Sequence, residues 1–461
     1  MLTKNKIEEE LEKFLPEDSI LSSLEECYVY SQDGTNTRKS EKTPDVVIFP
    51  ETIEEVQQVV KFANIHEIPV TARGAGTNLI GACLPDSGGI VMNFSKMNKI
   101  ISINKTDMTT VVQPGVVLGE LQKAVEEIGL FFPPDPSNLR VSTVGGAIAQ
   151  SAGGPKTFKY GTTKDYILGL KVVLADGSLM ITGSNTIKNA TGYPLSQLFV
   201  GSEGTLGIVV EATLKLIPKP ETSRVMLAYF DSINDATVSV NNIIDSKLFP
   251  STIDFMDNNA INTVEKFYPA NLKTDKTAAL IIEIEGSKDS VLADGEKLKE
   301  VLLNSNASGI TISDTQEEYE RIWTARRASF AATAKLRPDV VTDDMIVPRS
   351  NLPKLVEGIN AICEKYHLQT CVIGHVGDGN VHPQIALNLE DKQEYANYIA
   401  AKDEMYKLTI KLGGTLSGEH GIGSEKKKYI PMAVDKVALE YMRKIKTVFD
   451  PKNILNPDKI F

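Results

Sequence analysis

Cysteine is scarce in this sequence of 461 residues, and its spacing excludes two kinds of redox centre. The four cysteines are Cys27, Cys83, Cys363 and Cys371, and no two of them form a CxxC pair. With only four cysteines and no such pair, neither a disulfide framework nor a protein-bound iron–sulfur cluster is encoded here. Any redox chemistry of this chain would therefore need another electron carrier.

Long apolar runs are missing as well. No stretch reaches the roughly 18 uninterrupted apolar residues of a membrane-spanning helix. The opening residues include Lys4, Lys6 and three consecutive glutamates from Glu8, so they lack the apolar core of a secretory signal. We expect no integral membrane segment and a cytoplasmic location.

Positive charge is in deficit. The 49 basic and 60 acidic residues give a formal net charge of −11, which repels phosphate backbones, so nucleic acid is not expected as a partner. A length of 461 residues with 42% hydrophobic content exceeds what one ordinary core holds. The sequence therefore predicts several globular domains.

Changes of pattern along the chain predict four segments. They are an N-terminal helical segment (1–40), a glycine-rich segment with short strands (41–219), a segment of strands and helices (220–410) and a C-terminal segment (411–461). The first is marked by Ile7, Leu11 and Leu15 at helical spacing. The second opens with a strand, helix and strand over residues 46–71, and the third alternates strands with helices as antiparallel α+β domains do.

Glycine clusters recur in the second segment. Residues 72–81 follow a predicted strand, but they have GxGxxxxG spacing and no amphipathic helix begins there, so a Rossmann fingerprint is not favoured. Gly74 and Gly76 leave backbone N–H groups uncovered, which suits a pyrophosphate, although such a loop alone is more often an ordinary turn. Further clusters lie at residues 134–137, 142–147, 151–154, 160–161 and 201–208. Several loops that meet on one extended ligand explain this recurrence better than unrelated turns.

Together these motifs resemble those of the FAD-linked oxidases of the vanillyl-alcohol oxidase and p-cresol methylhydroxylase (PCMH) type. Within that family the sequence is similar to the branch of D-lactate dehydrogenases and the glycolate oxidase flavin subunit, from about residue 41 to the C-terminus. The resemblance implies an α+β fold with a two-subdomain PCMH-type FAD-binding domain (41–219) and an antiparallel α+β cap or substrate domain (220–410). It also implies a C-terminal helical segment that returns to the flavin site (411–461).

The resemblance also implies which residues bind FAD. They are Arg73, Gly74, Ala75, Gly76, Thr77, Asn78, Gly81, Pro134, Asp135, Ser137, Thr143, Gly145, Gly146, Ala152, Gly153, Gly154, Tyr160, Gly161, Glu203, Gly204, Gly207, Ile208 and Asn380. Members with covalently attached flavin carry a histidine where this chain has Thr77, so we expect non-covalent FAD.

Histidine is scarce too, and three of the five histidines fall in two short motifs at residues 374–383 and 417–423. Asp378 and Gly379 form a preferred two-residue hairpin turn, which would place His375 opposite His382. Directly opposed residues have Cβ atoms about 4.5 to 5.5 Å apart, a separation from which both rings reach one cation. Glu419 would complete a His₂Glu set with open positions, as in catalytic zinc and non-haem iron or manganese sites. Alternatively, the histidines flank a polar turn and Glu419 lies in a separate surface loop.

The resemblance implies a role for each of these side chains. His375, His382 and Glu419 would bind a divalent metal, which their chemistry allows to be Fe²⁺, Zn²⁺ or Mn²⁺. His420 would be the catalytic base. The spacing of Trp323 and Arg326, with two residues between them, matches a family pattern in which the arginine binds the substrate carboxylate. Without the resemblance, Arg326 and its neighbour would be interpreted as a solvated helix face.

These roles predict a dehydrogenase that removes a hydride from the α-carbon of a small D-2-hydroxy acid, with D-lactate as the leading substrate and glycolate or another D-2-hydroxy acid as the alternative. Relatives similar to D-2-hydroxyglutarate dehydrogenase bind the distal carboxylate through a threonine and a lysine. This chain has Phe330 and Thr342 at those places, which favours a small monocarboxylate. Gln384 stands where some relatives have asparagine.

The electron acceptor has to be external, because the sequence contains no iron–sulfur ligand set, nicotinamide fingerprint or membrane anchor. Among the acceptors that the family uses, which include quinone, cytochrome and iron–sulfur subunits, we expect an electron-transferring flavoprotein that passes the electrons ultimately to NAD. A rival hypothesis takes the His₂Glu pattern at face value and predicts a metallohydrolase in which the glycine loops are structural.

Overall fold

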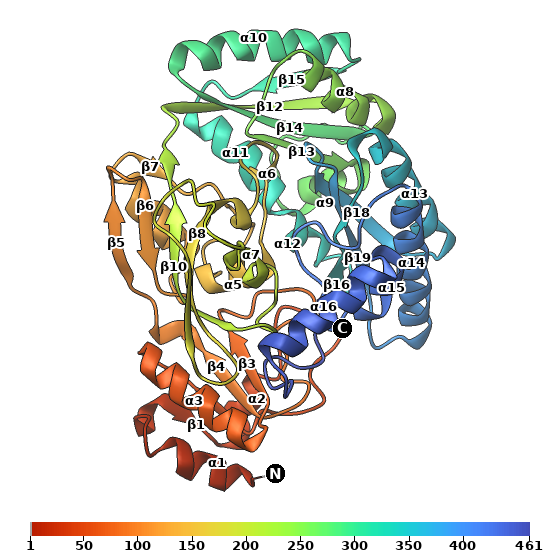
Figure 1. The fold of residues 1–461 in the computed structure, drawn as a ribbon. Helices are drawn as coiled ribbons and strands as arrows, with labels where there is room; N and C mark the ends of the chain where they lie inside the picture. The colour runs from red at the N-terminus through yellow and green to blue at the C-terminus, as the bar shows by residue number, and fades with distance from the viewer. Residues whose placement is uncertain (1) are drawn as a thin grey trace. The chain divides into compact units, whose positions relative to one another are not determined.

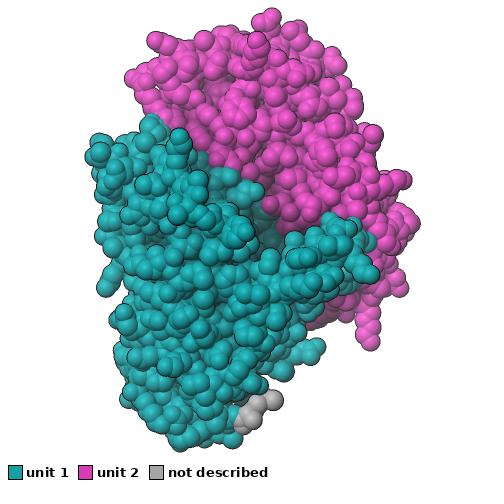
Figure 2. Space-filling model, viewed as in Figure 1, with its two compact units in different colours: residues 1–153, 162–219, 419–461 teal, residues 154–161, 220–418 magenta. Residues whose placement is uncertain are grey.

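The computed structural model describes residues 2–461, so Met1, the first residue of the predicted N-terminal segment, lies outside the described residues. The chain forms two compact units, coloured separately in Figure 2. Unit 1 contains the residues up to Gly153, residues 162–219 and residues 419–461, and unit 2 contains residues 154–161 and 220–418. The chain therefore passes from one unit to the other four times. The four-segment division expected from the sequence stays a prediction.

Unit 1 contains a four-stranded, a five-stranded and a two-stranded sheet, and most of its elements carry their labels in Figure 1. Its strands are β1 (Ile20–Leu21), β2 (Val46–Ile48), β3 (Val70–Arg73), β4 (Ile90–Asn93), β5 (Ile100–Asn104), β6 (Thr109–Val112), β7 (Leu130–Phe131), β8 (Ile167–Val173), β9 (Leu179–Gly183), β10 (Ile208–Lys215) and β11 (Ile217–Pro218). Its helices are α1 (Lys4–Leu11), α2 (Leu24–Val29), α3 (Ile53–His66), α4 (Leu118–Glu126), α5 (Val144–Gln150), α7 (Ser196–Phe199), α15 (Ile430–Ala433) and α16 (Lys436–Phe449).

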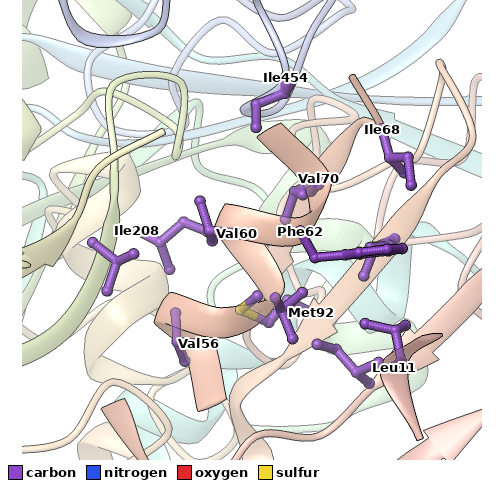
Figure 3. Close-up of a cluster of buried hydrophobic side chains, with 14 of the residues drawn as sticks. Leu11, Val56, Val60, Phe62, Ile68, Val70, Met92, Ile208 and Ile454 are labelled. Carbon is purple, nitrogen blue, oxygen red and sulfur yellow. The ribbon is translucent and has the colours of Figure 1, made fainter. Parts of the chain in front are cut away.

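The first sheet of unit 1 contains the predicted strand, helix and strand. β2 and β3 both pair in parallel with β4, and α3 makes the connection between them. Thr52 and Glu55 form a reciprocal capping box at the start of α3. The buried side chains of α3, among them Val56, Val60 and Phe62, pack in one core with the sheet and with Ile454 near the C-terminus (Figure 3). The C-terminal residues therefore belong to the core of unit 1.

The second sheet of unit 1 is antiparallel, in the order β5-β6-β10-β8-β9. β10 pairs on both sides and alternates buried with half-buried residues, as a central strand with one face on the core does. Ile208 at its start joins the core cluster that contains α3. The two larger sheets of unit 1 thus share hydrophobic contacts, although each has its own strand order.

Unit 2 is built on one antiparallel sheet, in the order β15-β12-β14-β13-β18-β19-β16, with β17 pairing to β19. Its strands are β12 (Thr222–Phe230), β13 (Thr252–Asp257), β14 (Ala278–Gly286), β15 (Gly309–Ile312), β16 (Asp339–Thr342), β17 (Met345–Ile346), β18 (Gln369–His375) and β19 (Asn380–Leu387). Its helices are α6 (Thr157–Tyr160), α8 (Ile233–Asp245), α9 (Asn258–Phe267), α10 (Lys288–Asn304), α11 (Gln316–Arg327), α12 (Ser329–Thr333), α13 (Leu352–Lys365) and α14 (Lys392–Lys411). The predicted α+β fold, with its antiparallel second domain, is confirmed.

The core of unit 2 joins helices α9 and α11 to the sheet. Ile261 and Val264 of α9 and Ile322 of α11 are buried against strand residues such as Leu227 and Ile373. Along residues 2–461, none of the helices combines the length and the apolar content that crossing a bilayer requires.

Candidate functional site

The glycine loop after β3 lies against the start of α5. A Cβ atom added to Gly74 would stand 2.3 Å from Thr143 Oγ1, which accepts the N–H of Gly146 at 3.2 Å. Gly76 has a φ of +71°, and a Cβ there would stand 2.2 Å from the Arg73 guanidinium. Only glycine tolerates these approaches without displacement. Two loops predicted to bind FAD therefore lie side by side within unit 1.

Glu203 connects a third predicted FAD loop to the segment that follows His420. Its carboxylate accepts the backbone N–H groups of Ile422 at 2.7 Å and Gly423 at 2.8 Å. Burial raises the pKa of Glu203 to about 7, against the opposing effect of these two N–H groups. The glycine loop of Glu203 thus fixes the backbone next to the predicted base.

Four predicted FAD residues belong to unit 2. They are Gly154, Tyr160, Gly161 and Asn380. The segment of residues 154–161 is attached to β14, because the Tyr160 hydroxyl donates to Glu285 and the amines of Lys156 and Lys159 lie 3.0 and 3.3 Å from the same carboxylate. Charged side chains therefore explain why this piece of the glycine-rich region groups with unit 2.

β18 and β19 form the predicted hairpin, but their register differs from the predicted one by two residues. His375 lies opposite Asn380, and His382 lies opposite Ile373. The prediction that His375 and His382 face each other directly is therefore wrong. The connecting loop has four residues, Val376 to Gly379, instead of two.

The longer loop has a structural cause, because neighbouring elements bind its two glycines. The Gly377 N–H donates to Ile253 O at 3.2 Å, and Gly379 O accepts the Val347 N–H at 3.1 Å. A shift of two residues keeps every side chain on its face of the sheet, whereas a shift of one would not. His375 and His382 are therefore diagonal neighbours on one face, with ring centroids 5.2 Å apart.

The predicted metal ligands come together in spite of this register. One ligand atom from each of His375, His382 and Glu419 lies within 4.8 Å of the other two. Glu419 is the residue directly after unit 2, and the N–H of Gly418 before it donates to Asp344 at 2.9 Å. The alternative of Glu419 in a separate surface loop does not match this grouping.

In both histidines, Nδ1 is the ring nitrogen that lies close to an oxygen atom of a neighbouring aspartate. His375 Nδ1 lies 2.7 Å from Asp254 Oδ1, and His382 Nδ1 lies 3.3 Å from the carbonyl oxygen of Asp343. A ring that donates its Nδ1 proton to an oxygen keeps Nε2 as a metal ligand. The two rings are about 95% buried, which limits competition from water. The donor set fits a divalent cation.

Arg326 is buried at the end of α11, with 7% of its surface exposed, and its Nε lies 2.7 Å from Asp254 Oδ2. Arg327 has a side chain that is 51% exposed. The solvated-face interpretation is therefore right for Arg327 and wrong for Arg326. Burial alone would raise the pKa of Asp254, but the charges of Arg326 and His375 outweigh it and hold that pKa below its usual range.

Sequence analysis missed two buried acids beside the predicted ligands, Asp254 and Asp344. Asp344 accepts hydrogen bonds from Asn380 Nδ2 at 2.6 Å, Ser417 Oγ at 2.6 Å and the Gly418 N–H. Asp254 lies within β13, all six residues of which are buried. The available signal for Asp254 was an acidic residue between the apolar residues Ile253 and Phe255, because an acid in such surroundings is rare unless its charge has a partner.

Two observations test whether the chain fits FAD. The glycine loops of unit 1 approach one another where a Cβ would collide, which leaves backbone N–H groups accessible to an anion. In unit 2, Asn380 is buried and its Oδ1 has no hydrogen-bond donor among residues 2–461. His420, adjacent to Glu419 in unit 1, keeps a side chain that is 19% exposed. The loops of unit 1 suit the phosphates of FAD, and the buried Oδ1 of Asn380 in unit 2 suits a hydrogen-bond donor of a ligand.

Glycine-rich anion-binding loops joined to an antiparallel α+β unit with a buried histidine pair define an FAD-dependent oxidoreductase. The chain belongs to the FAD-linked oxidases: residues 44–183 match the family model of the FAD binding domain, and residues 219–460 match that of the C-terminal domain of FAD linked oxidases. The family resemblance inferred from the sequence is confirmed.

Relatives and solved structures agree with this assignment. The chain is 40% identical to glycolate oxidase subunit GlcD of Bacillus subtilis over 100% of this chain and 97% of that protein. It is 34% identical to a D-lactate dehydrogenase of Anaerostipes hadrus over 90% of this chain and 89% of that protein. The crystal structure of p-cresol methylhydroxylase with substrate bound superposes with a TM-score of 0.83 at 18% identity, over 99% of this chain and 96% of that chain. The predicted PCMH-type fold is confirmed.

Proposed function

We propose that this FAD-dependent oxidoreductase of the glycolate oxidase and D-lactate dehydrogenase type oxidises D-lactate to pyruvate with the help of a divalent metal. The observation that carries the proposal is the group of His375, His382 and Glu419 within 4.8 Å, beside a buried Arg326. A cation site next to a buried guanidinium suits a substrate that carries a hydroxyl and a carboxylate on adjacent carbons.

Each side chain has a defined task in this proposal. Arg326 binds the substrate carboxylate, and His420 takes the hydroxyl proton as the α-hydrogen leaves with two electrons. Bound FAD supplies the acceptor for that hydride. A cation held by His375, His382 and Glu419 supplies Lewis acidity toward the hydroxyl. The glycine loops of unit 1 would hold FAD through backbone N–H groups, without a covalent bond.

Substrate size is proposed from the surroundings of Gln384. This side chain is buried, and its Oε1 accepts hydrogen bonds from Ser329 Oγ at 3.1 Å and Thr333 Oγ1 at 3.0 Å. Both donors lie on α12, which also carries Phe330. Phe330 is apolar and Thr342 carries no charge, so neither position offers a cation to a second carboxylate, and a monocarboxylate is favoured over a diacid.

Anaerobic flavin bleaching tests the substrate assignment. The FAD-loaded enzyme is mixed with D-lactate, L-lactate, glycolate or D-2-hydroxyglutarate, and the loss of the flavin absorption is followed. We expect the fastest reduction with D-lactate and none with L-lactate. Reduction by L-lactate but not by D-lactate would overturn the proposal. Glycolate is the second candidate because the relative at 40% identity is a glycolate oxidase subunit.

We propose an electron-transferring flavoprotein as the electron acceptor, with NAD as the final acceptor. Relatives named as subunits favour a protein partner, and the sequence itself contains no second redox centre. Reoxidation of the lactate-reduced enzyme by purified electron-transferring flavoprotein, at a rate that matches turnover, is the expected result. Reoxidation by a quinone analogue alone would instead support the quinone alternative. The cytoplasmic location stays a prediction.

The metallohydrolase alternative has less support, because a chain with an FAD-binding domain over residues 44–183 needs no separate explanation for its glycine loops. Elemental analysis of the purified enzyme tests the metal itself. About one divalent ion per chain is expected from one His₂Glu set. A protein that turns over lactate without any bound ion would remove metal assistance from the proposal and leave the redox assignment intact.

A further inference from the structure

Asp254 contacts both functional groups of unit 2 with its two carboxylate oxygens. Oδ1 lies 2.7 Å from Nδ1 of His375, and Oδ2 lies 2.7 Å from Nε of Arg326. The side chain of Asp254 has no exposed surface. No third ion-pair partner of Asp254 occurs among residues 2–461.

The backbone holds Asp254 rigidly in this position. β13 lies inside the sheet and is paired to β14 on one side and β18 on the other. In the second pairing Asp254 lies directly opposite His375. Directly opposed side chains of an antiparallel pair are the closest neighbours in a sheet. The contact between carboxylate and ring therefore follows from strand register and does not depend on a flexible loop.

Burying the Asp254 carboxylate costs folding free energy, and a purely structural role would not explain why a charged residue stands at this position. An isolated buried carboxylate costs several kcal/mol even after relaxation, and an apolar residue at such a position is often neutral or stabilising. Phe255 and Met256, the next residues on the same strand, show that apolar side chains fit here. The cost is offset by the two partners that Asp254 orients.

We propose that Asp254 is a positioning residue that serves the metal ligand and the carboxylate anchor together. Through Oδ1 it keeps the Nδ1–H tautomer of His375, so that Nε2 is available to the cation. Through Oδ2 it holds Arg326 by an ion pair to Nε, a close contact of opposite charges without hydrogen-bond geometry, and this leaves the two terminal nitrogens for the substrate carboxylate. This inference rests on the proposed function and adds that one buried charge couples cation binding to substrate anchoring.

The test compares two asparagine variants of the same strand. D254N removes the shared charge, whereas D257N makes the same chemical change at the buried Asp257, which contacts neither His375 nor Arg326 and instead caps α9 by accepting the Ala260 N–H. Asparagine is also a good N-cap residue, so D257N preserves that contact. Both variants are prepared with FAD bound and are stripped of metal with a chelator.

Two binding measurements that do not use turnover are made on each protein. Zn²⁺ is titrated calorimetrically, and oxalate, which carries the carboxylate that Arg326 would anchor, is titrated by the flavin absorption change. Loss of a partner behind a metal ligand typically weakens metal affinity about 10-fold to 100-fold. We expect that loss for D254N, with weaker oxalate binding as well, and unchanged binding of both for D257N. Unchanged Zn²⁺ and oxalate binding by D254N would overturn the inference.

A measurement on the unmodified chain covers the case in which D254N does not fold. The chain has only five histidines, so ¹⁵N labelling of histidine resolves individual rings, and the H375A variant assigns the signal of His375. The inference requires the Nδ1–H tautomer of His375 in the metal-free enzyme, and the Nε2–H tautomer would overturn it. If the unmodified enzyme binds no Zn²⁺, metal assistance fails and this inference fails with it. If only the D254N comparison fails, the proposed function stands.

Discussion

The two acidic side chains of β13, Asp254 and Asp257, are buried alike and have opposite pKa shifts. Burial would raise the pKa of both. At Asp254 the charges of Arg326 and His375 outweigh burial and hold the pKa below its usual range. At Asp257 only backbone N–H groups oppose burial, and the pKa rises to about 7. The difference shows that a buried acid with a lowered pKa has positively charged groups close to it, and such clusters are common at functional sites.

Unit 1 contains a second case of the Asp257 kind. Glu203 also accepts two backbone N–H groups in a fully buried position, and burial raises its pKa to about 7. Lys426 and Lys459 lower that pKa but contribute less than the backbone groups. Backbone donors alone therefore do not keep a buried carboxyl ionised here, whereas a guanidinium at 2.7 Å does.

Removal of the histidine partner should give the largest effect. H375A deletes one of three metal ligands and the group on Asp254 Oδ1, so the enzyme should lose its divalent ion while retaining FAD. Because metal assistance contributes several kcal/mol, turnover should fall by about a thousandfold or more. Elemental analysis and flavin-reduction rates measure both. H66A, at the exposed end of α3, is the matched control and should change neither. Normal metal content in H375A would contradict the ligand assignment.

Removal of the guanidinium is the next largest change. R326M leaves Asp254 as a buried charge without its cation, which typically costs about 3–5 kcal/mol of folding stability. The substrate also loses its anchor, so kcat/KM should fall about a hundredfold. R327M alters the neighbouring side chain, whose ion pair with Glu320 is exposed, and should cost less than about 1 kcal/mol. Equal losses of stability and of kcat/KM in R326M and R327M would contradict the role of Arg326 as the carboxylate anchor.

Local pattern predicted much of the fold. The limits of α16, Lys436 and Phe449, follow from local sequence signals, which are an acidic N-cap at Asp435 and a proline after the last turn. The capping box of Thr52 and Glu55 likewise marks the start of α3. Periodicity and capping need only neighbouring residues, so one sequence suffices for such elements.

The hairpin register and the role of Asp254 could not be predicted in the same way. The preference of Asp-Gly pairs for two-residue turns depends only on the turn residues. The actual loop also depends on a hydrogen bond from Gly377 to Ile253, which is distant in the sequence. The pairing of Asp254 with His375 and Arg326 depends on the order of strands in the sheet. His375, His382 and Glu419 nevertheless lie together, and both histidines stay on one face because the register shift is two residues; that the three bind a metal stays a prediction.

The attachment of residues 154–161 to unit 2 is another long-range feature. Lys156 lies 2.8 Å from Glu283 and 3.0 Å from Glu285, both on β14. Glu283 also accepts the Trp323 indole N–H at 2.8 Å, so the same carboxylate holds the helix that carries Arg326. In the sequence these residues are ordinary charges on a strand and a loop, and only the fold brings them together.

The smallest expected effect concerns pH and isolates Asp257. Its pKa rises on folding from an ordinary 3.8 to about 7, so the native state binds a proton more tightly than the unfolded state does. The stabilisation is complete below about pH 4 and is lost as pH rises toward 7, at no more than about 1.4 kcal/mol per pH unit. Asp254, with its lowered pKa, acts in the opposite direction and loses its contribution as pH falls below its unfolded value. D257N should therefore flatten the decline in unfolding free energy between pH 5 and 7, measured by urea denaturation, and leave the part due to Glu203. A slope identical to that of the unmodified chain would mean that Asp257 is ionised in the native state, and the contrast between the two ends of β13 would disappear.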